Sequence, residues 1–141
     1  MKKIKGFYFE IEDRIYNVPI LVVFGDYDYN QKILKSRLGF EDEGQKYSGG
    51  EAGIIERQEI NNGKITKSLF SATIWIPELT FTIDNYGAIA HEVLHVALHN
   101  LKKVGFNLDY ENQEPLNYYF EYLYKQIIDK CFKQYKKRKK I

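Results

Sequence analysis

The chain has 141 residues, of which 44% are hydrophobic and 28% are charged. This composition favours one ordered domain over residues 1–141 and argues against global disorder. The single cysteine, Cys131, excludes an internal disulfide and a zinc site built from several cysteines. No stretch approaches the ~18 apolar residues of a membrane span, and no apolar segment follows the basic N-terminus as in a signal peptide. We therefore expect a cytoplasmic protein with no membrane partner.

The net charge of +2 is distributed unevenly along the chain. Residues 125–141 contain eight basic side chains and one acidic side chain, so the preceding residues carry a net charge of −5. Such a basic end is suited to contact nucleic acid or another polyanion through Lys136, Lys137, Arg138, Lys139 and Lys140. We favour the alternative of a solvated, frayed tail over residues 134–141, because no aromatic or glycine pattern accompanies the run.

The first part of the chain predicts two strands and a short helix. Residues 4–11 alternate between two faces, which is typical of a strand. The apolar run Pro19–Phe24 predicts a buried strand, and Asn30–Leu38 predicts a helix that ends at Gly39. Residues 40–53 are polar and rich in glycine, which indicates a loop.

A hairpin is predicted in the middle of the chain. Asn61, Asn62 and Gly63 separate two β-prone runs, 52–60 and 64–76, and Asn-Gly is a strong hairpin turn signal. Pro77 should end the second strand because proline cannot donate to the ladder. We expect Ser71–Ile76 to form a sheet edge that offers its backbone to an extended peptide.

Two helices are predicted in the second half. The first covers Ala88 to about Val104, with Asp84 or Asn85 as its N-terminal cap and Gly105 as its end. The second begins near Pro115 and runs to about Lys133. Strands followed by helices indicate an α+β fold with an N-terminal antiparallel or mixed sheet.

The five residues from His91 to His95 spell HExxH, the signature of zinc peptidases. On a helix, His91 and His95 lie about 40° apart around the axis and can bind one metal ion. Glu92 lies close enough to accept a proton from a metal-bound water. Zn²⁺ is therefore the expected cofactor.

Apolar residues cover most of the remaining surface of this helix, which predicts a buried helix. A polar stripe on a buried helix must line a cavity or bind a ligand, because buried polar groups need partners. The alternative is a chance match to the motif with ordinary surface histidines.

Zinc in a catalytic site needs a third protein ligand. His99 is about 12 Å from His91 along the helix, too far for all three histidines to share one ion. The metzincin spacing HExxHxxGxxH is also absent, because Leu98 and Leu101 occupy its last two defined positions. We interpret His99 as a supporting or surface residue.

An acid near the second helix is the better candidate for the third ligand. Glu114 is our first choice because it precedes Pro115 in the first turn of that helix, and the helix dipole is the alternative reason for an acid there. The further candidates are Glu121, Asp109 and Glu111. Tyr118, one turn after Glu114, could donate to a developing oxyanion or could be an ordinary core tyrosine.

The motif, followed by a glutamate on the next helix, resembles the gluzincin pattern of zinc metallopeptidases in a minimal form. Over about residues 70–125, the chain is also similar to small uncharacterised HExxH proteins of tailed phages. The residues that carry this likeness are Ile74–Ile76, Ala90–His95, Gly105 and Asn112–Tyr118.

This resemblance implies a zincin-like fold, with Zn²⁺ bound by His91, His95 and Glu114 and with Glu92 as the general base. For a protein of phage origin, it implies the host cytoplasm or the virion as the location. The chain departs from the pattern at Asn117, where a small residue is usual, and at Pro115 directly after the expected ligand.

Three functions are compatible with these features. The first is a zinc-dependent metallopeptidase acting on a peptide or protein substrate, with Glu92 and Tyr118 as catalytic residues. The second is a non-catalytic, zinc-stabilised phage structural or host-factor-binding protein. The third is a DNA-associated or repressor-cleaving protease that is tethered by the basic tail.

Overall fold

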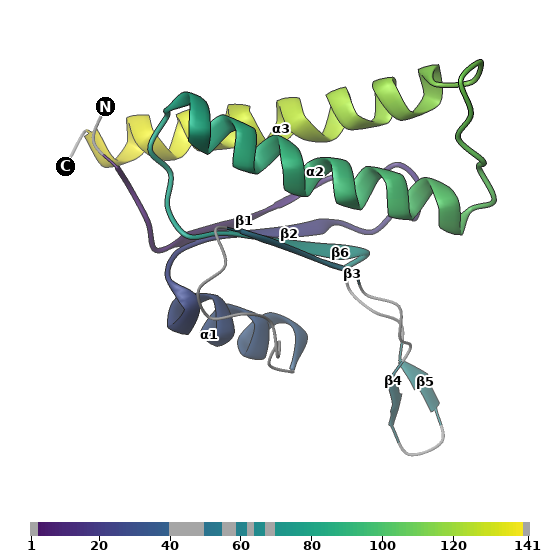
Figure 1. The fold of residues 1–141 in the computed structure, drawn as a ribbon. Coiled ribbons are helices and arrows are strands. Elements are labelled where there is room, and N and C mark those ends of the chain that lie inside the picture. The colour runs from purple at the N-terminus through teal and green to yellow at the C-terminus, as the bar shows by residue number, and fades with distance from the viewer. Residues whose placement is uncertain (1–2, 40–49, 55–58, 62–63, 67–69, 140–141) are drawn as a thin grey trace.

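The computed structural model describes residues 3–39, 50–54, 59–61, 64–66 and 70–139. A four-stranded sheet lies between a short helix on one face and two long antiparallel helices on the other (Figure 1). The predicted α+β class is confirmed. The elements in chain order are β1 (Phe7–Ile11), β2 (Ile20–Phe24), α1 (Tyr27–Leu38), β3 (Glu51–Ile54), β4 (Glu59–Asn61), β5 (Lys64–Thr66), β6 (Ala72–Ile76), α2 (Ile83–Lys103) and α3 (Glu114–Lys139).

The sheet has the strand order β1-β2-β6-β3, with β2 parallel to β6 and the other two pairs antiparallel. All of β2 is buried, as its continuous apolar sequence predicts for a strand covered on both faces. The expectation that Ser71–Ile76 forms an edge is wrong, because β6 pairs with β2 on one side and β3 on the other. The strand at this end of the sheet is β3.

The predicted hairpin is confirmed for the strands that the structure describes. Its two arms pair as β3 with β6 and, further out, as β4 with β5. Asn61 is the register partner of Lys64 in the outer pair. The turn residues Asn62 and Gly63 lie outside the described residues. Pro77 follows β6 directly, as expected from its missing N–H.

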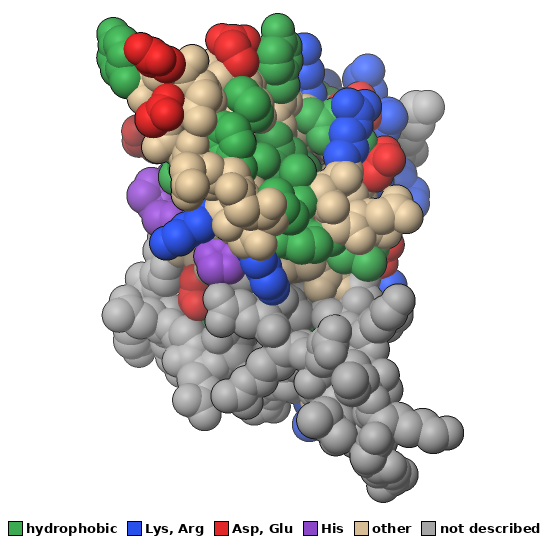
Figure 2. Space-filling model, turned by 90° about the vertical axis from the view of Figure 1, so that its right-hand side faces the viewer, with side chains coloured by type: hydrophobic (Ala, Val, Ile, Leu, Met, Phe, Trp, Pro, Cys, Tyr) green, Lys and Arg blue, Asp and Glu red, His purple; other side chains and the backbone are tan. Residues whose placement is uncertain are grey.

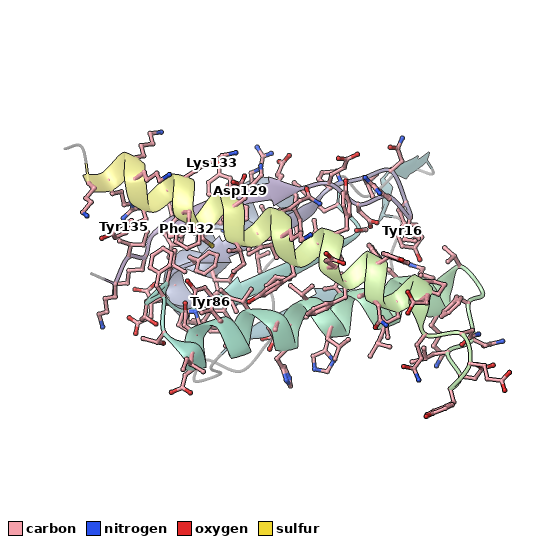
Figure 3. All side chains as sticks on the ribbon, turned by 90° about the horizontal axis from the view of Figure 1, so that it is seen from above. Tyr16, Tyr86, Asp129, Phe132, Lys133 and Tyr135 are labelled. Atoms are coloured by element: carbon pink, nitrogen blue, oxygen red, sulfur yellow. The ribbon has the colours of Figure 1, made fainter. Side chains whose placement is uncertain are left out.

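The main core lies between the sheet and the two long helices. Buried residues recur at helical spacing on α2, as at Ile89, Val93 and Val96, and on α3, as at Leu123 and Ile127. Aromatic residues close one end of this layer, where Phe81 packs at 5.2 Å between ring centroids against both Phe132 and Tyr135. Figure 3 shows Tyr86 with the latter two at this end and Tyr16 at the other.

The cap of α2 differs from the prediction. Thr82 is the N-cap, and its hydroxyl accepts a hydrogen bond from the Asn85 N–H at 3.2 Å. Asp84 and Asn85 therefore lie inside the first turn. Asp84 still suits this position, because an acidic side chain there interacts favourably with the helix dipole. Among the described helices, none has the length and apolar character that a membrane crossing needs.

Helix α3 continues to Lys139, past the predicted end at Lys133 and into the segment that we expected to fray. The Arg138 guanidinium donates hydrogen bonds to the carbonyls of Lys5 and Gly6 at 3.0 and 3.1 Å. It also lies over the ring of Phe7, 5.3 Å from the centroid. These contacts hold the last turn against the N-terminal segment, so the frayed-tail expectation fails at Arg138.

Helix α2 is only partly buried, contrary to the prediction from its apolar sequence. Leu94 and Leu98 are 41% and 38% exposed. Two helices form this layer, so the sheet and α3 cover two sides of α2 and leave its outer side uncovered. An apolar residue on that side is exposed whatever its hydropathy.

Candidate metal centre

His91 and His95 project from the same side of α2, one turn apart. Their Nε2 atoms are 3.0 Å apart, and their ring centroids are 4.7 Å apart. Two nitrogen ligands of one tetrahedral zinc, at ~2.0–2.1 Å from the ion, lie about 3.3 Å from each other. The observed separation is that of a hydrogen bond between the two imidazoles and is about 0.3 Å shorter than the separation of two zinc ligands. Both residues are exposed to solvent.

Figure 2 shows the histidine side chains on the surface of the molecule, next to basic and polar side chains. The two histidines therefore do not line a cavity in a buried helix, which was one of the two expectations for the polar stripe. The other, a bound ligand, stays a prediction. An exposed imidazole pair is accessible to a metal ion from solvent without any opening of the core.

Glu92 lies on the same helix but is buried, with 7% of its surface exposed. Its carboxylate accepts a hydrogen bond from the Ala52 N–H on β3. Burial raises the pKa of Glu92, and the nearby His91 and His95 together with the Ala52 N–H partly offset this rise. A carboxylate with a raised pKa binds a proton more readily than an ordinary glutamate, as a general base requires.

Gly50, directly before β3, lies close to β6 and to Glu92. Its φ of +154° is rare for residues with a side chain. A Cβ atom there would lie 3.3 Å from the Trp75 carbonyl oxygen and 3.6 Å from Glu92 Cγ. The sequence interpretation placed Gly50 and Ala52 in a loop or hairpin arm and missed their contact with the motif. The available signal was the density of glycine, at positions 49, 50 and 53.

The structure does not bring a third ligand to the histidines from the residues that it describes. Among them, no three His, Cys, Asp or Glu side chains form a group that could hold a metal ion. Glu114, Glu121, Asp109, Glu111 and His99 are all described residues, so none of them completes a site with His91 and His95 in this structure.

The packing of α3 on α2 explains the position of Glu114. Asn100 Nδ2 donates to Tyr119 Oη at 3.0 Å, which aligns these two residues across the antiparallel pair. His95 lies five residues before Asn100, and Glu114 lies five residues before Tyr119. Because the two helices are antiparallel, these offsets run in opposite directions along the helix axes and separate His95 from Glu114 by about 15 Å. Asn100 also lies about 180° from His91 around α2, so α3 and the histidines are on different sides.

The other predicted site residues have local roles or face solvent. Glu121 forms an ion pair with Lys125 at 2.6 Å. Asp109 accepts hydrogen bonds from the backbone N–H groups of Glu111 and Asn112 in the loop before α3. Tyr118 is 67% exposed on the first turns of α3, so this structure does not place it beside Glu92.

A second polar cluster, which the sequence interpretation missed, lies two turns further along α2. The buried Asp13 carboxylate accepts hydrogen bonds from Ser71 Oγ, Asn100 Nδ2, Tyr119 Oη and the Ile15 N–H. The pKa of Tyr119 is raised, and burial is the largest cause. The phenol therefore stays protonated and acts as a hydrogen-bond donor. Among the described side chains, Asn100 Oδ1 is the buried polar atom left unpaired.

Comparison of the chain with protein-family models, curated proteins and solved structures gives no match. The features of the molecule that bear on its function are the geometry of the two histidines, Glu92 and β3.

Proposed function

We propose that this protein is a zinc-dependent hydrolase that cleaves peptide bonds at the HExxH segment of α2. The observation that carries the proposal is the 3.0 Å separation of the His91 and His95 Nε2 atoms, next to the buried carboxylate of Glu92. Neutral imidazole nitrogens suit zinc, so this donor pair fits the metal. The described residues support two ligands and leave the third to be identified.

Zinc, when bound by the two histidines, would supply a Lewis acid for water and for the substrate carbonyl. A Glu92 carboxylate oxygen accepts the proton of the attacking water and returns it to the leaving amide nitrogen. The Ala52 N–H holds this carboxylate in place. Burial raises the pKa of Glu92, which helps the carboxylate to hold the proton after it leaves the water and before it reaches the leaving nitrogen.

The position of β3 supports a peptide as the substrate. β3 is at one end of the sheet order, and its Ala52 contacts Glu92 directly. A strand at the edge of a sheet can bind an extended peptide through main-chain hydrogen bonds. In the proposal, β3 therefore takes the role that we first assigned to the strand now seen as β6.

The first test is the zinc content of the purified protein by elemental analysis, for the wild type, His91→Ala and Glu114→Ala. We expect about one zinc per chain in the wild type and in Glu114→Ala, and loss of zinc in His91→Ala. Zinc lost in both variants would assign Glu114 as the third ligand and contradict the arrangement of α2 and α3. Zinc retained in His91→Ala would reject the histidine pair as the site.

The second test is turnover of an unstructured protein substrate by Glu92→Gln. We expect loss of activity with zinc content unchanged, because Gln keeps the size of the side chain and cannot accept the proton. Full activity in this variant would reject Glu92 as the base.

A non-catalytic zinc-binding protein is the second candidate. The exposure of both histidines and the lack of a third described ligand favour it. In that case zinc would bind and substrates would not be cleaved by the wild type under any metal loading. The Glu92→Gln change would then have no functional effect.

A further inference from the structure

A cavity of about 280 Å³ opens where α2 passes into α3. Its wall combines the end of α2, the connecting loop and the start of α3. The apolar residues that line it are Leu98, Leu101, Phe106, Leu108 and Leu116. Figure 2 shows hydrophobic side chains gathered in the middle of the face that carries this connection.

The cavity is formed by the way α2 ends. Gly105, at φ +87°, donates its N–H to the Lys102 carbonyl at 3.0 Å, and the Phe106 N–H bonds the Leu101 carbonyl at 3.0 Å. This pair of hydrogen bonds is a Schellman motif, which brings the residue after the glycine back onto the last helical turn. The loop then continues past Leu108, which remains 46% exposed.

The cavity lies beside the candidate metal centre on the same helix. Leu98, in its wall, follows His95 by three residues, and Leu94 extends the exposed apolar surface back between the two histidines. The centre of the helical wall is about seven residues, or about 10.5 Å, beyond the midpoint of the histidine pair. An extended peptide rises about 3.4 Å per residue, so this distance equals about three residues.

The size of the cavity decides which ligand it suits. Sites for drug-sized ligands and cofactors usually enclose ~300–1,000 Å³, and this one is at the lower limit while open to solvent. Its wall is mostly apolar, with Lys102 and Asn107 as the polar members. It suits a single large apolar side chain, which gains free energy when it leaves water.

We propose that this cavity is a substrate subsite for a large apolar side chain, leucine, methionine or phenylalanine, about three residues from the peptide bond held at His91 and His95. The three-residue spacing rests on the proposed function. Recognition of the apolar side chain depends on the cavity alone.

The test compares two peptides, acetyl-Ala-Ala-Phe-Ala-Ala-amide and its all-alanine counterpart, in calorimetric titrations of the metal-free, full-length protein. We expect the phenylalanine peptide to bind at least about tenfold more tightly, because its ring is removed from water. Leu108→Glu should abolish this preference by placing a charge at the cavity.

Val104→Glu is the matched control. Val104 is 52% exposed in the same segment but is not part of the cavity wall, so this variant should keep the preference. Equal binding of the two peptides by the wild type would overturn the subsite. Equal effects of the two substitutions would overturn it as well.

The two proposals can fail separately. No zinc binding by the wild type, with the peptide preference intact, would reject the proposed function and leave the apolar site. Zinc binding and cleavage without any preference would reject the subsite. In longer peptides with the phenylalanine at different positions, the cleaved bond should move with it at a constant distance of about three residues, and a fixed cleavage position would overturn this spacing.

Discussion

Helix α2 carries two polar clusters that differ in how their hydrogen-bonding capacity is used. Around Asn100, the side chains are buried and bind one another, with Asp13 accepting from donors on three other parts of the chain. Around His91 and His95, the side chains are exposed, and each imidazole Nε2 is directed at the other. The same helix thus contains a closed polar cluster and an open one.

The difference shows how to separate structural polar residues from candidate ligands. A buried polar group must be satisfied within the fold, because an unpaired one costs about 1–3 kcal/mol. The Asp13 cluster meets this requirement except at Asn100 Oδ1, which is left unpaired, and it ties α2 to α3 and to the residue before β6. The histidine pair is exposed and has no such requirement, and its two Nε2 atoms lie within hydrogen-bonding distance of each other.

The largest expected effect concerns the closed cluster. Asp13→Ala removes the acceptor of three buried hydrogen bonds and one part-buried hydrogen bond and should lower the free energy of unfolding by about 3–5 kcal/mol. Urea unfolding measures this change. Asp84→Ala, at an exposed first-turn position of α2, is the control and should cost no more than about 1 kcal/mol. Similar losses in both variants would contradict a structural role for the Asp13 cluster.

The open cluster should respond to zinc instead. Zinc at 100 times its dissociation constant should raise the unfolding free energy of the wild type by about 2.7 kcal/mol. Thermal melts with and without zinc should show this increment in the wild type and in His99→Ala, and no increment in His95→Ala. An increment that persists in His95→Ala would place the metal elsewhere.

A smaller effect follows from the raised pKa of Glu92, which burial causes. A carboxyl whose folded pKa exceeds its unfolded value disfavours folding once it ionises. Metal-free wild type should therefore lose stability relative to Glu92→Gln as the pH rises from about 4.3 through the folded pKa. Thermal melts between pH 4 and pH 8 would measure the difference in stability between the two proteins. A stability difference that does not change with pH would show that it does not come from ionisation of Glu92.

The smallest effect is expected on α3. The Glu121–Lys125 pair is exposed, with 54% and 72% of the two side chains accessible, so Glu121→Ala should change stability by only about 0.5 kcal/mol. Its zinc content should equal that of the wild type, because α3 faces a different side of α2. Loss of zinc in this variant would restore Glu121 as the third ligand.

Local patterns predicted the local features of this protein. The i, i+4 spacing of His91 and His95 depends only on the geometry of one helix, and Pro77 and Gly105 mark the ends of their elements through their own backbone chemistry. The fully apolar sequence of Ile20–Phe24 likewise indicated a buried strand. In each case the information lies within a few residues.

Features that depend on distant contacts were not predictable in this way. Asp13 and Tyr119 are 106 residues apart in sequence, and no local period links them. Strand order placed β3 rather than β6 at the end of the sheet. The choice of Glu114 used its place in the first turn of the second helix. Its distance from the histidines depends instead on the offset of α3 along α2 and on the side of α2 that α3 covers, to which the Asn100–Tyr119 contact belongs.

The contacts of Arg138 with Lys5 and Gly6 bring the first and last parts of the described chain together. The two ends can therefore be joined by a short linker without disturbing the sheet. A circular permutant opened within the exposed Asn107–Tyr110 segment should fold, because chain ends are tolerated best at exposed loops. In such a protein the chain would remain unbroken within α2, which carries Glu92, and within β3, which contacts it. The break would fall in the loop that forms part of the cavity wall.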